Sequence, residues 1–139
     1  MSEFTMRTEI PASVEKVWRT ISDFAAPEKY LPIVRNTVIV GTGVGSIRTL
    51  TMEDGNESIE RLDEIDHENR SLKYTILNSK LLASSLKGRM TIYELGNNRC
   101  IVEWTCVFYP IGDAESRIVE KYRELFEIGF QGLKMLYGT

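Results

Sequence analysis

The sequence has few of the residues that build disulfides, zinc sites and catalytic triads. Its 139 residues include two cysteines and one histidine. Cys100 and Cys106 fall in one predicted strand, where a rise of about 3.3 Å per residue places them roughly 20 Å apart, too far for a disulfide. His67 lies in a polar turn, with no cysteine or second histidine at ligand spacing. We therefore expect reduced thiols, no metal or other cofactor, and neither Ser-His nor Cys-His catalysis.

Positively charged clusters and long apolar runs are also missing. The net charge is −3 and the pI is near 5.3. The sequence has no cluster of Lys and Arg residues that could release the counterions of a nucleic-acid backbone. The apolar runs are far shorter than the roughly 18 residues that span a bilayer. Glu3, Arg7 and Glu9 interrupt residues 1–10, where a signal peptide would be apolar. These features predict a cytoplasmic protein that neither binds nucleic acid nor inserts stably into a membrane.

What the sequence does contain is the patterning of a single α+β domain over residues 1–139. Its hydrophobic content of 42% suffices for one core. A strand over residues 3–10 precedes a helix that Ser13 can cap, and Pro27 and Pro32 limit a second helix to a very short segment. Six strands with turn signals between them, including a loop over residues 78–85, are predicted over residues 34–40, 46–52, 57–65, 71–77, 86–95 and 99–108. The pattern is that of an antiparallel meander.

The last segment, residues 114–137, has an apolar stripe at helical spacing. At 1.5 Å per residue this helix would be roughly 35 Å long. The strand at 86–95 alternates cleanly between apolar and polar residues, so one face of the sheet needs a cover, and this helix can supply it. Gly129 and Gly132 each cost a helix about 1 kcal/mol relative to alanine. They either leave space for a ligand or let the helix approach the sheet closely.

One predicted hairpin brings an arginine and a glutamate together. Asp54-Gly55 suits a three-residue loop with Gly55 in the left-handed region, which pairs Met52 with Asn56. That register sets Arg48 opposite Glu60, on the more apolar face of the hairpin. Burying such a pair costs several kcal/mol per ion unless hydrogen bonds compensate, so it indicates a functional site. The alternative is a structural ion pair that fills the cavity.

Five segments, together with the order of the elements, carry a resemblance to a known superfamily. They are residues 10–18 (IPASVEKVW), 43–48 (GVGSIR), 54–55 (DG), 60–66 (ERLDEID) and 72–76 (LKYTI). They resemble the polyketide cyclase/dehydrase and lipid-transport branch of the START-like (SRPBCC) superfamily. The resemblance implies a helix-grip fold, in which a seven-stranded curved antiparallel sheet surrounds a long C-terminal helix and two short helices follow the first strand. It also implies a ligand cavity between sheet and helix.

The hairpin is also similar to those of plant abscisic acid receptors and lachrymatory factor synthase, whose counterparts of Arg48 and Glu60 lie in the cavity. Leu86 stands here at the position of a functional tyrosine of both, and Pro32 at that of the receptors' lysine anchor. The resemblance places Tyr74, Tyr122, Phe126 and Phe130 in the cavity. We add Leu86 and also Leu50, which shares the face of Arg48, as predicted ligand contacts. Aromatic residues at helical spacing commonly just pack, so a core role is the alternative for Tyr122, Phe126 and Phe130.

The strand at 99–108 allows two orientations. Alternation would bury Val102, Trp104, Cys106 and Phe108, whereas alignment to the receptors from Pro110 places Glu103 in the cavity. We take Glu103 as the predicted ligand contact.

Three functions remain open at this point. The first is binding of a small hydrophobic or polyketide-like molecule, oriented by Arg48 and Glu60. The second is a cofactor-independent cyclase, dehydratase or isomerase, in which Arg48 polarises a carbonyl oxygen and Glu60 moves a proton. The third is a regulatory interaction module with a vestigial cavity, which a solid core and an exposed apolar patch would favour.

Overall fold

A computed structural model describes residues 1–78 and 83–138 of the chain. Its elements follow in the order β1 (Ser2–Ile10), α1 (Val14–Ile21), the 3₁₀ helix η1 (Pro27–Lys29), β2 (Val34–Val40), β3 (Ile47–Met52), β4 (Glu57–Asp66), β5 (Ser71–Ile76), β6 (Ala83–Gly96), β7 (Arg99–Pro110) and α2 (Glu115–Tyr137). The described strands form one antiparallel seven-stranded sheet in the order β1-β7-β6-β5-β4-β3-β2. Of the loop predicted over 78–85, residues 79–82 lie outside the described residues, and residues 83–85 belong to β6.

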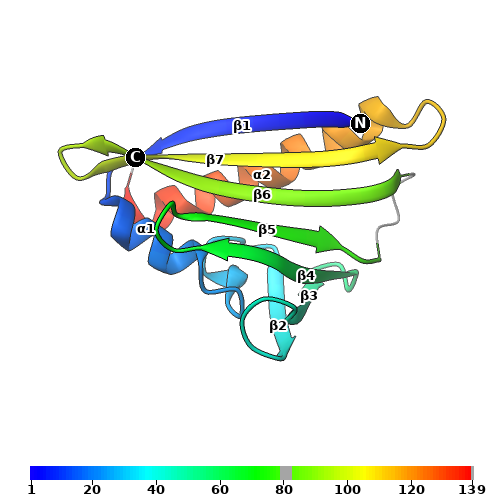
Figure 1. Cartoon of the computed structure of the whole chain (residues 1–139), viewed down its shortest axis with the longest axis horizontal. Helices are drawn as coiled ribbons and strands as arrows, with labels where there is room; N and C mark the ends of the chain where they lie inside the picture. The colour runs from blue at the N-terminus through cyan, green and yellow to red at the C-terminus, as the bar shows by residue number, and fades with distance from the viewer. Residues whose placement is uncertain (79–82, 139) are drawn as a thin grey trace.

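The sheet curves around α2, which runs along its concave side, and α1 closes one end (Figure 1). Ser13 caps α1, because its Oγ accepts a hydrogen bond from the Lys16 amide at 3.3 Å. Pro27 is the first residue of η1, a position where a backbone N–H group would have no acceptor within the helix, so its absence in proline is tolerated. The predicted helix-grip fold, with two short helices after the first strand, is therefore confirmed. Within the described residues, no helix is long and apolar enough to cross a membrane.

Both glycines of α2 mark places where other segments press against the helix. A Cβ atom on Gly129 would lie 2.5 Å from the Trp104 ring, and one on Gly132 would lie 1.9 Å from the carbonyl oxygen of Tyr30. Both distances are too short for any side chain. Of the two interpretations of these glycines, close approach is the one that the structure adopts.

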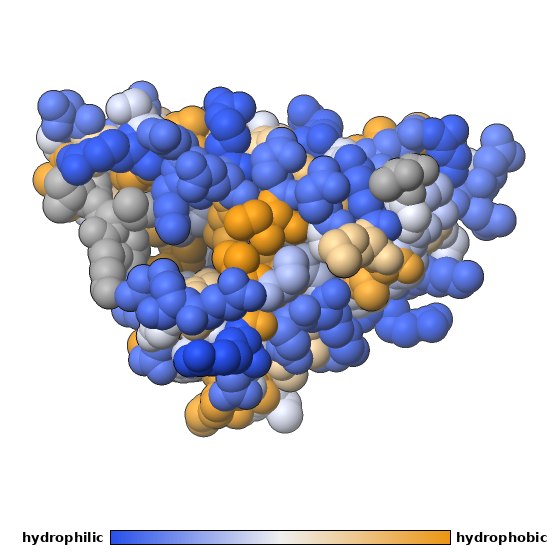
Figure 2. Space-filling view, turned by 180° about the vertical axis from the view of Figure 1, so that it is seen from behind, coloured by the Kyte–Doolittle hydropathy of each residue, from blue (hydrophilic) through white to orange (hydrophobic). Residues whose placement is uncertain are grey.

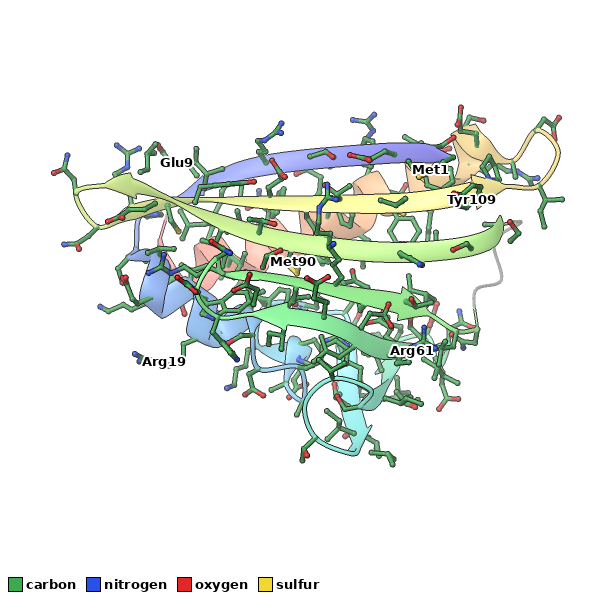
Figure 3. All side chains as sticks on the ribbon, in the orientation of Figure 1. Met1, Glu9, Arg19, Arg61, Met90 and Tyr109 are labelled. Atoms are coloured by element: carbon green, nitrogen blue, oxygen red, sulfur yellow. The ribbon has the colours of Figure 1, made fainter. Side chains whose placement is uncertain are left out.

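Aromatic side chains fill the centre of the space between sheet and helix. Trp104 of β7 stacks on Phe126 of α2 with ring centroids 4.4 Å apart, and its Nε1 donates a hydrogen bond to Tyr74 Oη at 3.0 Å. Tyr30 lies edge-on to Trp104, and its hydroxyl donates at 3.7 Å to the sulfur of Met90, which Figure 3 labels on β6. This part of the interior is solid core.

Candidate functional site

The β3–β4 hairpin has the predicted register. Gly55 has φ = 86°, and the Met52 amide donates to the Asn56 carbonyl oxygen at 2.8 Å. Arg48 is consequently paired with Glu60 across the two strands. Side chains alternate along β4, so Arg61, labelled in Figure 3, takes the outer face and pairs with Asp63 there.

Arg48 and Glu60 form a buried ion pair whose polar atoms have partners. The Nε and Nη2 atoms of Arg48 lie 2.9 and 2.7 Å from Glu60 Oε1, and Nη1 donates to the carbonyl oxygen of Phe24 at 3.2 Å. The second carboxylate oxygen, Oε2, accepts a hydrogen bond from Ser58 Oγ at 2.9 Å. The two side chains are 5% and 9% exposed. Each nitrogen of the guanidinium therefore already has an acceptor.

The surroundings favour the protonated form of Arg48. Burial works against the charged guanidinium, but the negative charge of Glu60 and the two nearby tyrosines outweigh it and raise the pKa of Arg48. The Arg48 guanidinium also stacks over the Phe24 ring at 3.9 Å. Burial raises the pKa of Tyr74 and of Tyr122 well above the ordinary tyrosine value, so both hydroxyls keep their protons.

A pocket of about 420 Å³ opens between the tip of the β3–β4 hairpin, the end of β5 and the N-terminal half of α2. Figure 2, which views the molecule from the side opposite to that of Figure 1, shows a hollow and an apolar area bordered by hydrophilic residues. The lining residues are Ile33, Met52, Glu53, Asp54, Asn56, Glu57, Ser58, Ile76, Asn78, Lys121, Tyr122 and Leu125. The pocket thus combines an apolar interior with a charged mouth.

The predicted site residues divide between the pocket and the core. Tyr122 lines the pocket, whereas the other apolar candidates are buried in the core, namely Leu50, Tyr74, Leu86, Phe126 and Phe130. Arg48 and Glu60 do not line it either, but Ser58 does, and its hydroxyl reaches Glu60. The ion pair therefore lies one hydrogen bond behind the pocket wall.

Glu103 does not face the cavity, and the prediction that placed it there is wrong. It pairs across the strands with Arg7 of β1, and its Oε2 lies 2.7 Å from Arg7 Nε on the outer face of the sheet. The neighbouring Trp104 takes the inner face, where it stacks on α2. Trp104 buries more apolar area than a carboxylate could, so the alternation that buried Val102 and Trp104 decides the orientation.

Sequence reasoning missed several pocket residues, although patterns could have indicated three of them. Met52 shares the face of Arg48 on β3, and Ile76 follows Tyr74 by two residues on β5. Leu125 lies three residues after Tyr122 on α2, on the same side of the helix. Lys121 and Ile33 carried no comparable signal.

Three comparisons place the chain among known proteins. Residues 1–135 match the model of the family described as polyketide cyclase / dehydrase and lipid transport. MLP-like protein 423 of Arabidopsis thaliana is 31% identical over 101 residues, and the match spans 63% of each protein, less than two thirds of the relative's length.

Solved structures agree over nearly the whole chain. The protein XoxI of Bacillus cereus superposes with a TM-score of 0.90 at 25% identity, over 99% of this chain and 96% of that one. A norcoclaurine synthase point mutant of Thalictrum flavum, in complex with a transition-state analogue, superposes with a TM-score of 0.77 at 20% identity, over 98% and 93% of the two chains. The second likeness shows the fold alone. With the family match covering nearly its whole length, the chain belongs to the polyketide cyclase / dehydrase and lipid transport family of START-like proteins.

Proposed function

We propose that this protein binds a small hydrophobic molecule in the pocket between the sheet and α2. The observation that carries the proposal is the pocket itself, whose interior is formed by Ile33, Met52, Ile76, Tyr122 and Leu125. Small-molecule sites usually have volumes of about 300–1,000 Å³ and mostly apolar walls. At about 420 Å³, this pocket suits a compact ligand. The ligand-binding fold of the family supports the same conclusion.

The enzymatic alternative, a cofactor-independent cyclase, dehydratase or isomerase, would use Arg48 and Glu60. A carbonyl ligand would need to reach a donor of Arg48, but the guanidinium is 5% exposed, does not line the pocket, and directs three of its five N–H groups to Glu60 and the Phe24 carbonyl oxygen. Glu60 could take a proton only through Ser58, because the pocket wall includes Ser58 and not the carboxylate. The geometry therefore favours binding, with the ion pair as support for the wall.

A regulatory interaction module with a vestigial cavity is the third possibility. The solid centre of the core favours it, whereas the open pocket at the hairpin end speaks against it. We also propose that the protein acts in the cytoplasm. The buried, unpaired thiols of Cys100 and Cys106 support a reducing compartment.

The proposal is tested by filling the pocket. The probe is naphthalene, a compact apolar molecule, and its binding is followed by amide chemical shifts of the ¹⁵N-labelled protein. We expect saturable shifts centred on Met52, Ser58 and Ile76. Leu125→Trp should abolish them, because the indole would occupy the apolar interior. Leu136→Trp is the matched control, since Leu136 is half-exposed on the same helix and outside the pocket.

Two outcomes of this titration would contradict the proposal. If naphthalene does not bind the wild-type protein, or if it binds the Leu125→Trp variant as well as the control, the pocket is not a hydrophobic binding site.

A further inference from the structure

The hydroxyl of Tyr122 makes no hydrogen bond within residues 1–78 and 83–138, and it is not fully enclosed, because every fully buried side-chain nitrogen or oxygen there has a partner. The residue is 7% exposed and lines the pocket from α2. The hydroxyl is therefore open to the pocket, where it can bond to a polar group of a ligand. Because burial favours the protonated phenol, Tyr122 offers a donor to that group.

Ser58, on the sheet side of the pocket, offers the opposite function. Its single hydroxyl proton is directed to Glu60 Oε2 at 2.9 Å. The other carboxylate oxygen, Oε1, is held by Arg48, so this arrangement is fixed from behind. Towards the pocket Ser58 therefore presents only oxygen lone pairs, which can accept a hydrogen bond from a ligand and cannot donate one.

The charged groups at the mouth are mostly negative. Glu53, Asp54 and Glu57 contribute three carboxylates, and Lys121 contributes one ammonium group. Three negative charges and one positive charge leave a formal charge of −2 at this opening. An anionic ligand would add a further negative charge beside them, at a place where its own hydration is partly lost.

We propose that the pocket selects neutral apolar molecules that carry a hydroxyl group and discriminates against carboxylates of the same skeleton. A hydroxyl group can accept a hydrogen bond from Tyr122 and donate one to Ser58. A carboxylate could accept from Tyr122, but it has no proton for Ser58 and it is repelled at the mouth. This inference rests on the proposed function and adds the chemical class of its ligand.

The test compares naphthalene, 2-naphthol and 2-naphthoate, which share one ring system, by the same chemical-shift titration at pH 7. We expect 2-naphthol to bind at least about 10-fold more tightly than 2-naphthoate. Tyr122→Phe should weaken 2-naphthol by about 2- to 10-fold, the usual range for one neutral hydrogen bond. It should leave naphthalene unchanged, because phenylalanine keeps the apolar wall. Tyr93→Phe is the matched control, since Tyr93 is exposed on β6 outside the pocket.

The outcomes separate this inference from the proposed function. If naphthalene binds and 2-naphthoate binds as tightly as 2-naphthol, the selectivity is overturned and the hydrophobic site stands. If Tyr122→Phe changes 2-naphthol no more than Tyr93→Phe does, the role of Tyr122 is overturned. If naphthalene itself does not bind, the proposed function fails and this inference fails with it. The comparison of 2-naphthol with 2-naphthoate uses the wild-type protein, so it does not depend on how any variant folds.

Discussion

Replacing Arg48 with methionine should lower the free energy of unfolding by about 3–5 kcal/mol, the usual cost of removing one partner from a buried ion pair. The variant loses two nitrogen–oxygen contacts of 2.9 and 2.7 Å to Glu60 Oε1. Glu60 would stay 9% exposed, with Ser58 as its remaining donor in the described structure. Water cannot easily replace the guanidinium there, so the carboxylate keeps most of its desolvation cost.

Removing both charges should have a much smaller effect. In the double variant Arg48→Met/Glu60→Leu, no buried charge remains, and such replacements are often neutral or stabilising by about 1–4 kcal/mol. The Phe24 carbonyl oxygen and the Ser58 hydroxyl each lose a partner, which offsets about 0.5–1.5 kcal/mol apiece. We therefore expect the double variant to lie within about 2 kcal/mol of the wild-type protein.

Urea denaturation followed by tryptophan fluorescence measures these differences. With a slope of about 2 kcal/mol per M, the single variant should shift the midpoint down by roughly 1.5–2.5 M. Arg7→Met is the matched control, because it breaks the ion pair between Arg7 and Glu103, whose N–O distance is also 2.7 Å. The Arg7 side chain is 63% exposed, and exposed ion pairs contribute about 0–1 kcal/mol to the free energy of unfolding. If Arg48→Met shifts the midpoint no more than Arg7→Met does, the argument from burial is refuted.

Four further predictions concern the helix contact, the thiols and the outer face. Gly132→Ala should destabilise the protein by about 1–3 kcal/mol in thermal denaturation, because the clash of the new methyl group with the Tyr30 carbonyl oxygen outweighs the helix preference of alanine. The control is Gln131→Ala at the exposed neighbouring position, which should be nearly neutral. Iodoacetamide at pH 8 should label neither cysteine in the folded protein and both in urea, because burial raises the pKa of Cys100 to about 11 and that of Cys106 to about 12. For the same reason the free energy of unfolding should fall as the pH rises above about 8.5, where the thiols of the unfolded chain ionise first, and a flat profile from pH 8 to 10 would contradict this. Glu103→Gln should leave the affinity for naphthalene unchanged within about twofold, because a hydrogen bond on the outer face adds nothing to the pocket; a loss of about 10-fold or more would mean that the two faces are coupled.

Local patterns along the chain determined the helices and strands, and also which two residues form the buried ion pair. A strand has a side-chain period of two, and a loop closed by Gly55 permits one register, so the pairing of Arg48 with Glu60 followed from a few neighbouring residues. The orientation of β7 was equally available from alternation. Alignment to distant relatives pointed to Glu103 instead, and it was the weaker guide because it ignores which side chain gains more from burial.

Only the tertiary structure decided where space remains. The centre of the fold is filled because Trp104 and the Tyr30 carbonyl approach α2 at Gly129 and Gly132, and these segments are far apart in the sequence. The pocket proposed to bind a ligand lies at the hairpin end, and Tyr122 is the one predicted ligand contact that lines it. A cavity is the small difference between the volume that the backbone encloses and the volume that side chains from several elements occupy, and no local pattern along one segment encodes that difference.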